Sequence, residues 1–126
     1  MSTILLVDDH HAFRTVFGEV LRVKGYTVLE AATVADVDHI VEHHPGSVDL
    51  LIVEAVLTTT NGVGVALRLR ARYPKLHVLY ISEERPHELS THHELPAGAP
   101  FLRKPFTAED LCEKVEELLG TRTIML

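Results

Sequence analysis

The feature that most constrains this chain is the stretch DLLIVEAVLTTTNG, residues 49–62, in which an unbroken apolar run ends at a carboxylate. A short run of Leu, Ile and Val without polar alternation is typical of a strand buried on both faces, as in a parallel sheet covered by helices. Glu54 would stand where that strand leaves the core. Because ligands of open α/β sheets bind beyond the carboxyl ends of the strands, Glu54 is a candidate site residue.

Three other apolar runs also end in polar side chains. The run ILLV ends at Asp8 and Asp9, HVLYI ends at Ser82, and FLR ends at Lys104. If these strands are parallel neighbours, two aspartates, a glutamate, a hydroxyl and an ammonium meet at one edge of the sheet. The sequence therefore predicts a charged site at that edge.

Strand and helix patterns alternate along the whole chain. Buried strands are predicted over residues 3–7, 26–29, 48–53, 76–81 and 99–102. The intervening helices are predicted from Phe13 to Gly25, Val34 to His44, Val65 to Tyr73, Glu83 to Leu95 and Thr107 to Leu119. Capping boxes of Thr33 with Asp36 and of Thr107 with Asp110 are expected to begin the second and the last of these helices. In the fourth of these only Leu89 and Leu95 could anchor a helix, so we expect that helix to be short or mobile.

This alternation predicts a single α/β domain with a doubly wound, five-stranded parallel sheet and helices on both faces. Right-handed crossovers leave few ways to connect it. The flavodoxin-like strand order 2-1-3-4-5 makes the first and third strands neighbours, which places Asp8, Asp9 and Glu54 side by side. The domain is predicted to span residues 1–120, with 121–126 as a short tail or the start of a linker.

Composition narrows the classes of partner. A formal charge of −6 disfavours direct binding of nucleic acid through its phosphates. The apolar runs are far shorter than a bilayer span, and the N-terminus lacks a secretion signal. The lone Cys112 excludes an internal disulfide and fits a reducing compartment. We therefore expect a cytoplasmic protein without membrane contact.

The residues at the predicted edge suit phosphoryl chemistry. Three carboxylates in one crevice repel one another, and a hard cation such as Mg²⁺, bound by one or two of them together with water and an oxyanion, is the usual way to offset that repulsion. Lys104 would pair with a carboxylate or a phosphoryl oxygen, and the Ser82 hydroxyl could bind the same oxygen. This set can stabilise a phosphoryl group on a carboxylate nucleophile. No other cofactor is expected, since no Gly-rich phosphate loop follows the first strand.

The chain resembles the response-regulator receiver domain, the phosphoacceptor module of bacterial two-component signalling. The resemblance covers nearly the whole chain, through ILLVDD, DLLIVE, the glycine eight residues after Glu54, ISEE and GAPFLRKPF. It implies a metal-binding acidic pair at Asp8 and Asp9, a switch hydroxyl at Ser82, a conserved-type lysine before a proline at Lys104, and an aromatic rotamer switch at Phe101.

The chain departs from this family at the phosphoacceptor position. Receivers place Asp there, whereas this chain has Glu54, and the loop after it has Thr58 in place of the usual proline. The Glu carboxylate lies one methylene further out, in the space of an incoming phosphoryl group, and reaction geometry tolerates such a displacement poorly. It can instead stand partly where a phosphoryl group would stand, near Lys104 and Ser82. The mimicry is partial, because a carboxylate carries about one negative charge and a phosphate roughly 1.5 to 2.

These observations favour an atypical receiver, or pseudo-receiver: a signalling and binding module rather than an enzyme, with little or no dependence on phosphorylation. The resemblance implies a histidine kinase, a phosphotransfer protein or an effector as partner, bound through the face of the fourth helix, fifth strand and fifth helix, and leaves a homodimer open. The alternative is a working acceptor that takes phosphate from a histidine kinase onto Glu54 with Mg²⁺. The residues alone also permit a plain Glu54–Lys104 ion pair, and a helix-capping role for Asp8 and Asp9.

Overall fold

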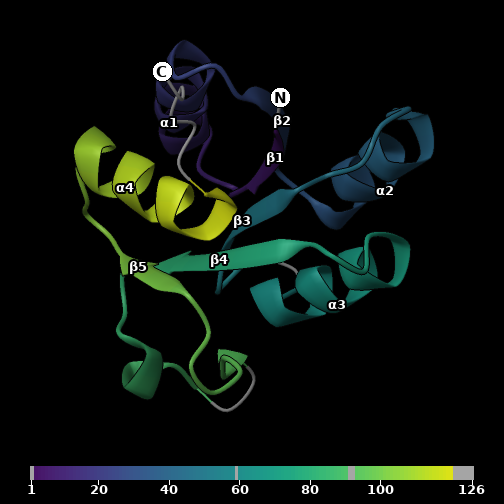
Figure 1. Ribbon diagram of the computed structural model, residues 1–126. Coiled ribbons are helices and arrows are strands. Elements are labelled where there is room, and N and C mark those ends of the chain that lie inside the picture. Colours follow the sequence, from purple (N-terminus) through teal and green to yellow (C-terminus); the bar gives the residue numbers. More distant parts are fainter. Residues whose placement is uncertain (1, 59, 91–92, 121–126) are drawn as a thin grey trace.

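The computed structural model describes residues 2–58, 60–90 and 93–120, and a five-stranded parallel sheet forms its centre (Figure 1). The strands are β1 (Thr3–Val7), β2 (Thr27–Ala31), β3 (Leu50–Glu54), β4 (His77–Ser82) and β5 (Phe101–Arg103). The helices are α1 (His11–Val23), α2 (Val34–His43), α3 (Gly62–Arg72) and α4 (Ala108–Leu119). The order β2-β1-β3-β4-β5 confirms the predicted fold class. The predicted tail, residues 121–126, lies outside the described residues.

Helices cover both faces of the sheet, and the sheet separates two hydrophobic cores, one under each helical layer (Figure 1). Successive side chains of a strand point to opposite faces. In β1, Leu5 and Val7 face the core that α2 and α3 cover, whereas Ile4 and Leu6 face the core under α1 and α4. The same alternation in β3 buries all five of its residues. This explains the unbroken apolar run that the strand shows in the sequence.

Two of the helices begin at capping boxes that the sequence predicted. The Thr33 hydroxyl accepts the Asp36 N–H at 3.1 Å, and the Asp36 carboxylate accepts the Thr33 N–H at 3.3 Å. Thr107 and Asp110 repeat this arrangement at the start of α4. Each cap satisfies backbone donors that a helix leaves open, which contributes about 1 kcal/mol.

No helix in the described part of the chain is long and apolar enough to cross a bilayer.

The segment between β4 and β5 differs from the prediction. In place of a continuous helix from Glu83 to Leu95, its described residues include a short 3₁₀ helix at Pro86–Glu88, and positions 91 and 92 lie outside the described part. The proline begins this turn, but every residue from 83 to 88 is exposed, so no apolar stripe holds a longer helix on the sheet. The face expected from a fourth helix, β5 and the last helix is therefore built from this irregular segment, β5 and α4.

Candidate functional site

The carboxyl edge of the sheet brings together the side chains that the sequence predicted there. Asp8 follows β1 and is fully buried, and Glu54, the last residue of β3, is 6% exposed. Ser82 ends β4 and is also buried. Lys104 follows β5, where its N–H donates to the Ser82 carbonyl at 2.8 Å. Parallel pairing of β1, β3, β4 and β5 in register is what assembles these four residues.

Lys104 is the hub of this cluster. Its Nζ donates to Asp8 Oδ2 at 2.8 Å and lies 2.7 Å from Glu54 Oε2. The second contact is an ion pair without hydrogen-bond alignment, since Glu54 Oε2 has no hydrogen-bond partner among the described residues. The ammonium also lies 4.1 Å from the centre of the Phe13 ring, a cation–π distance. One cation thus neutralises two buried carboxylates in part.

Burial and charge oppose each other at this cluster. Burial raises the pKa of Glu54 above its ordinary value, and the neighbouring Lys104 ammonium only partly offsets that effect. Burial also acts to lower the pKa of Lys104, but its contacts with Asp8 and Glu54 outweigh it and leave that pKa raised. The Glu54 carboxylate is therefore held in a surrounding that disfavours its charge.

The second aspartate of the pair is held from the loop after β3. Asp9 Oδ2 accepts the Thr58 N–H at 3.0 Å and also the Thr58 hydroxyl. Partial burial acts to raise the pKa of Asp9, but these two hydrogen bonds and the nearby His10 outweigh it and lower that pKa. The carboxylate therefore stays ionised with its orientation set by Thr58, the residue that stands in place of the family's usual proline.

Asp8, Asp9 and His10 together could bind a cation. Each offers one ligand atom, and the three atoms lie within 4.8 Å of one another. Carboxylate oxygens suit a hard cation such as Mg²⁺, and the imidazole nitrogen adds a ligand that transition metals prefer. His10 Nδ1 lies 3.1 Å from Asp8 Oδ1 and 3.4 Å from Asp9 Oδ1. The donor set fits a divalent cation, and Glu54 lies outside it.

The two predicted switch residues lie apart from the ion pair. Ser82 Oγ accepts the Glu84 N–H at 3.1 Å, and no bond between described residues joins it to Glu54. Phe101 is partly buried and packs against the core under α2 and α3. A cleft of about 240 Å³ nevertheless lies between Glu54, Ser82 and Lys104. The switch roles of Ser82 and Phe101 therefore stay predictions.

Gly62 lets the loop after β3 fold back against the site. Its N–H donates to the Ala55 carbonyl at 2.9 Å, and a Cβ there would lie 2.7 Å from the Glu54 carbonyl oxygen. We expect G62A to lower the free energy of unfolding by about 1–3 kcal/mol, because backbone atoms must shift to make room. Urea unfolding measures this.

The matched control is G64A in the same helix, where the new Cβ meets nothing nearer than 3.5 Å. We expect that variant to be neutral or up to about 1 kcal/mol more stable than wild type, because Ala favours helix over Gly. Equal losses in the two variants would show that the close approach to Glu54 is unimportant.

Comparison with known proteins identifies the family to which this site belongs. The family model described as response regulator receiver domain matches residues 4–116. The chain belongs to the receiver domain family. It is therefore a receiver domain of two-component signalling, as its motifs indicated. Receiver domains bind Mg²⁺ at an acidic pocket, and Asp8, Asp9 and His10 form the acidic cluster of this one.

The alignments with individual relatives cover nearly all of this chain. It is 32% identical over 120 residues to the sensor kinase CckA of Brucella abortus, covering 94% of this chain and 12% of that protein. It is 28% identical to the response regulator receiver protein CpdR of the same organism, covering 94% of this chain and 98% of that protein. The crystal structure of the receiver domain from the hybrid histidine kinase CckA superposes with a TM-score of 0.77 at 32% identity, covering 94% and 100% of the two chains.

Sequence reasoning missed two parts of the site. The Thr58 hydrogen bonds to Asp9 span 49 positions, and no local pattern indicates them. The sequence also showed no sign that the Phe13 ring lies under the Lys104 ammonium, because an apolar residue in the first helix is expected to pack in the core. The only hint of the Asp9 contact in the sequence was Thr58 itself, which stands where the family usually has a proline.

Proposed function

We propose that this receiver works as a pseudo-receiver, a protein-binding module whose signalling state depends little or not at all on phosphorylation of Glu54. The observation that carries the proposal is the contact of 2.7 Å between Glu54 Oε2 and Lys104 Nζ, inside a cluster that also holds the buried Asp8. A carboxylate already occupies the place beside the ammonium that a phosphoryl oxygen would take. Both parts of the proposal, signalling without phosphorylation and the pairing of Lys104 with Glu54 in place of a phosphoryl group, rest on this ion pair.

Charge supports this reading of the site. Asp8, Glu54 and Lys104 together carry two negative charges and one positive charge, and the pKa of Glu54 is raised chiefly by burial, with repulsion from Asp8 as a smaller cause. A transferred phosphoryl group would add about 1.5 to 2 further negative charges and would need a cation beside it. The longer side chain of Glu54 also places the nucleophilic oxygen away from the position of an aspartate, which impairs attack.

The direct test is incubation with acetyl phosphate and Mg²⁺, followed by intact-mass spectrometry. We expect no phosphorylated species at incubation times that label an ordinary receiver, the positive control. Stoichiometric labelling that disappears in E54Q would overturn the proposal.

The alternative, a working phosphoacceptor, draws on the cleft beside Glu54 and on the cation donors nearby. The cleft of about 240 Å³ is also lined by His10, Ser82 and Lys104, and Asp8, Asp9 and His10 could hold Mg²⁺ there. When bound, the cation would neutralise charge on a phosphoryl group. A histidine kinase that labels the wild type in the presence of Mg²⁺, and not after chelation, would establish this function.

Output is proposed to pass through the surface formed by the segment from Glu83 to Leu95, β5 and α4. The described residues of that segment make few buried contacts: residues 83–88 are exposed, and Leu95 is only partly buried against the core. Few buried contacts are typical of elements that change conformation at low cost. We propose that a histidine kinase, phosphotransfer protein or effector binds there, and that the receiver unit spans residues 1–120.

Glu54 should also give this receiver a characteristic pH dependence. Its pKa is raised above the ordinary value of 4.5, so the folded state binds a proton more tightly than the unfolded chain. The resulting stability is fully present below pH 4.5 and is lost as pH rises through the higher folded value. We expect E54Q to lack this decline and to match wild type at pH 7 within roughly 1 kcal/mol.

Urea unfolding of wild type and E54Q at intervals from about pH 4 to pH 8 measures the effect. Parallel stability curves for the two proteins would mean that burial does not disfavour the Glu54 charge. The variant E113Q is the matched control, because the Glu113 carboxylate is exposed on α4 and lies outside the buried cluster.

A further inference from the structure

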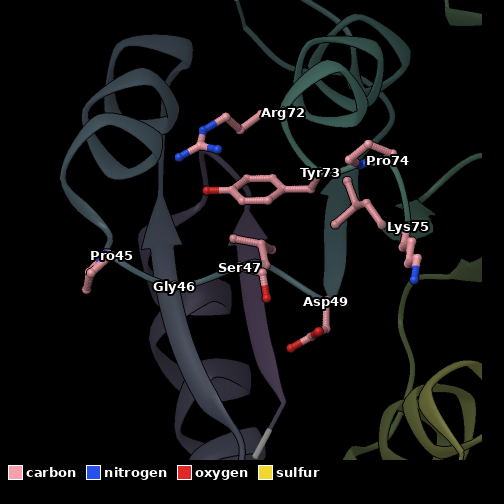
Figure 2. A pocket seen from close by; sticks show the side chains of 10 residues that line it. Pro45, Gly46, Ser47, Asp49, Arg72, Tyr73, Pro74 and Lys75 are labelled. Carbon is pink, nitrogen blue, oxygen red and sulfur yellow. The ribbon is translucent and has the colours of Figure 1, made fainter.

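A second cavity lies at the opposite, amino edge of the sheet, remote from the acidic cluster. It has a volume of about 550 Å³ and is formed by the loop before β3 and the turn between α3 and β4 (Figure 2). Its polar lining comes from Ser47, Asp49, Arg72, Tyr73 and Lys75. A cavity of this size holds a small organic ligand.

Tyr73 contributes a buried hydroxyl that has no partner. The residue is 7% exposed, and its Oη makes no hydrogen bond with any described residue. In Figure 2 the ring crosses the cavity and its hydroxyl points away from its own backbone, toward the side of Pro45 and Gly46. A buried hydroxyl without a partner is costly, and each such group in a native fold requires an explanation. A bound ligand with an acceptor oxygen would supply one.

The two cationic side chains of the cavity, Arg72 and Lys75, form no ion pair with the described residues. The Arg72 guanidinium carbon lies 5.4 Å from the centre of the Tyr73 ring, over the ring (Figure 2). By contrast Arg68, one turn earlier in α3, pairs with Asp38 at 2.7 Å. Two unpaired cations in a chain of net charge −6 mark a local preference for anions.

Asp49 sets a limit on what can bind. Its Oδ2 accepts the Thr3 N–H at 2.8 Å, and the residue belongs to the lining of the cavity. A carboxylate there repels a second anionic group and favours a hydroxyl donor. The ligand that fits is anionic at the Arg72 end and carries hydroxyl groups at the Asp49 end.

We propose that this cavity binds a phosphorylated polyol, such as a sugar phosphate. The phosphate is held by the Arg72 guanidinium and the Tyr73 hydroxyl, with Lys75 adding positive charge from the opposite rim. Guanidinium groups match phosphate oxygens with paired hydrogen bonds, which favours Arg72 as the main anchor. The Arg72 side chain is exposed and can swing outward to open the ring edge to the ligand. This site is independent of Glu54 and of the function proposed above.

The test is NMR titration of the ¹⁵N-labelled chain with three probes: inorganic phosphate, ribose 5-phosphate and ribose. We expect both phosphorylated probes to shift the amide signals of Ser47, Tyr73 and Lys75, with ribose 5-phosphate binding about tenfold tighter than phosphate. Ribose alone is expected to shift none of them. Absence of shifts with both phosphorylated probes, or equal shifts with ribose, would overturn the proposal.

Variants then assign the contacts. We expect R72Q to weaken ribose 5-phosphate binding about tenfold or more, and Y73F to weaken it about fivefold. Y73F should leave the midpoint of thermal unfolding unchanged or raised, because it removes an unpartnered buried hydroxyl. K24Q is the charge-matched control: Lys24 is exposed at the end of α1, which packs on the other core, and we expect less than a twofold change. Wild-type affinity in R72Q would contradict the proposal.

Discussion

Replacing Lys104 by methionine is expected to destabilise the receiver by about 3–5 kcal/mol at pH 7. Methionine retains most of the length and apolar contact of the lysine stem, including its place over Phe13, but removes the ammonium. Asp8 and Glu54 would then be two buried carboxylates without a cation. Removing one partner of a buried charge cluster costs much more than the intact cluster contributes, because the remaining charges stay desolvated. Urea unfolding at pH 7 measures the loss.

The control for K104M is K114M, which removes a partly exposed lysine on α4. Lys114 lies 3.4 Å from Glu117 in a surface pair, and such pairs contribute little, so we expect a change of about 0.5 kcal/mol or less. The double variant K104M/E54Q should recover about 1–2 kcal/mol of the loss, since it removes one of the two stranded carboxylates. Equal effects of K104M and K114M would show that Lys104 does not hold the cluster together.

The sequence was sufficient for the sheet, and the reason is physical. The strands β1, β3 and β4 are buried on both faces, so each requires an unbroken apolar run, and the polar residue that ends the run marks the edge of the core. The positions of Asp8, Glu54, Ser82 and Lys104 followed from that rule together with the flavodoxin-like strand order. The capping boxes at Thr33 and Thr107 were equally local, because a cap involves residues only three positions apart.

What the sequence could not supply were contacts decided by side-chain reach across the fold. The periodic pattern from Glu83 to Leu95 was weak, and its described residues form no α-helix but include a short 3₁₀ helix at Pro86–Glu88. The partner of Lys104 was open between a phosphoryl group, Asp8 and Glu54, and the geometry gives it both carboxylates. The unpaired hydroxyl of Tyr73 is likewise invisible in the sequence, where the residue reads as the end of a helix.

Shortening Glu54 to aspartate is expected to create a phosphoacceptor. With acetyl phosphate and Mg²⁺, E54D should be labelled at least about 100-fold faster than wild type, since a displacement of about 1 Å can cost a factor of that size. A carboxylate oxygen of Asp would form a bond to phosphorus as the bond to the acetate oxygen breaks, and acetate would leave with that electron pair. Retracting the head group by one methylene also opens space beside Lys104 for the phosphoryl oxygens.

Labelling of E54D is followed by intact-mass spectrometry over time, with E54N as the isosteric control that has no nucleophilic carboxylate. The double variant E54D/K104M separates space from charge: if the ammonium is needed to stabilise the incoming phosphoryl group, it should lose most of the rate that E54D gains. Labelling of wild type as fast as that of E54D would mean that the extra methylene does not block attack, and the working-acceptor alternative would then hold; no labelling of either protein would contradict the prediction for E54D. A rate gain confined to E54D would instead attribute the block to the length of one side chain in an otherwise intact site.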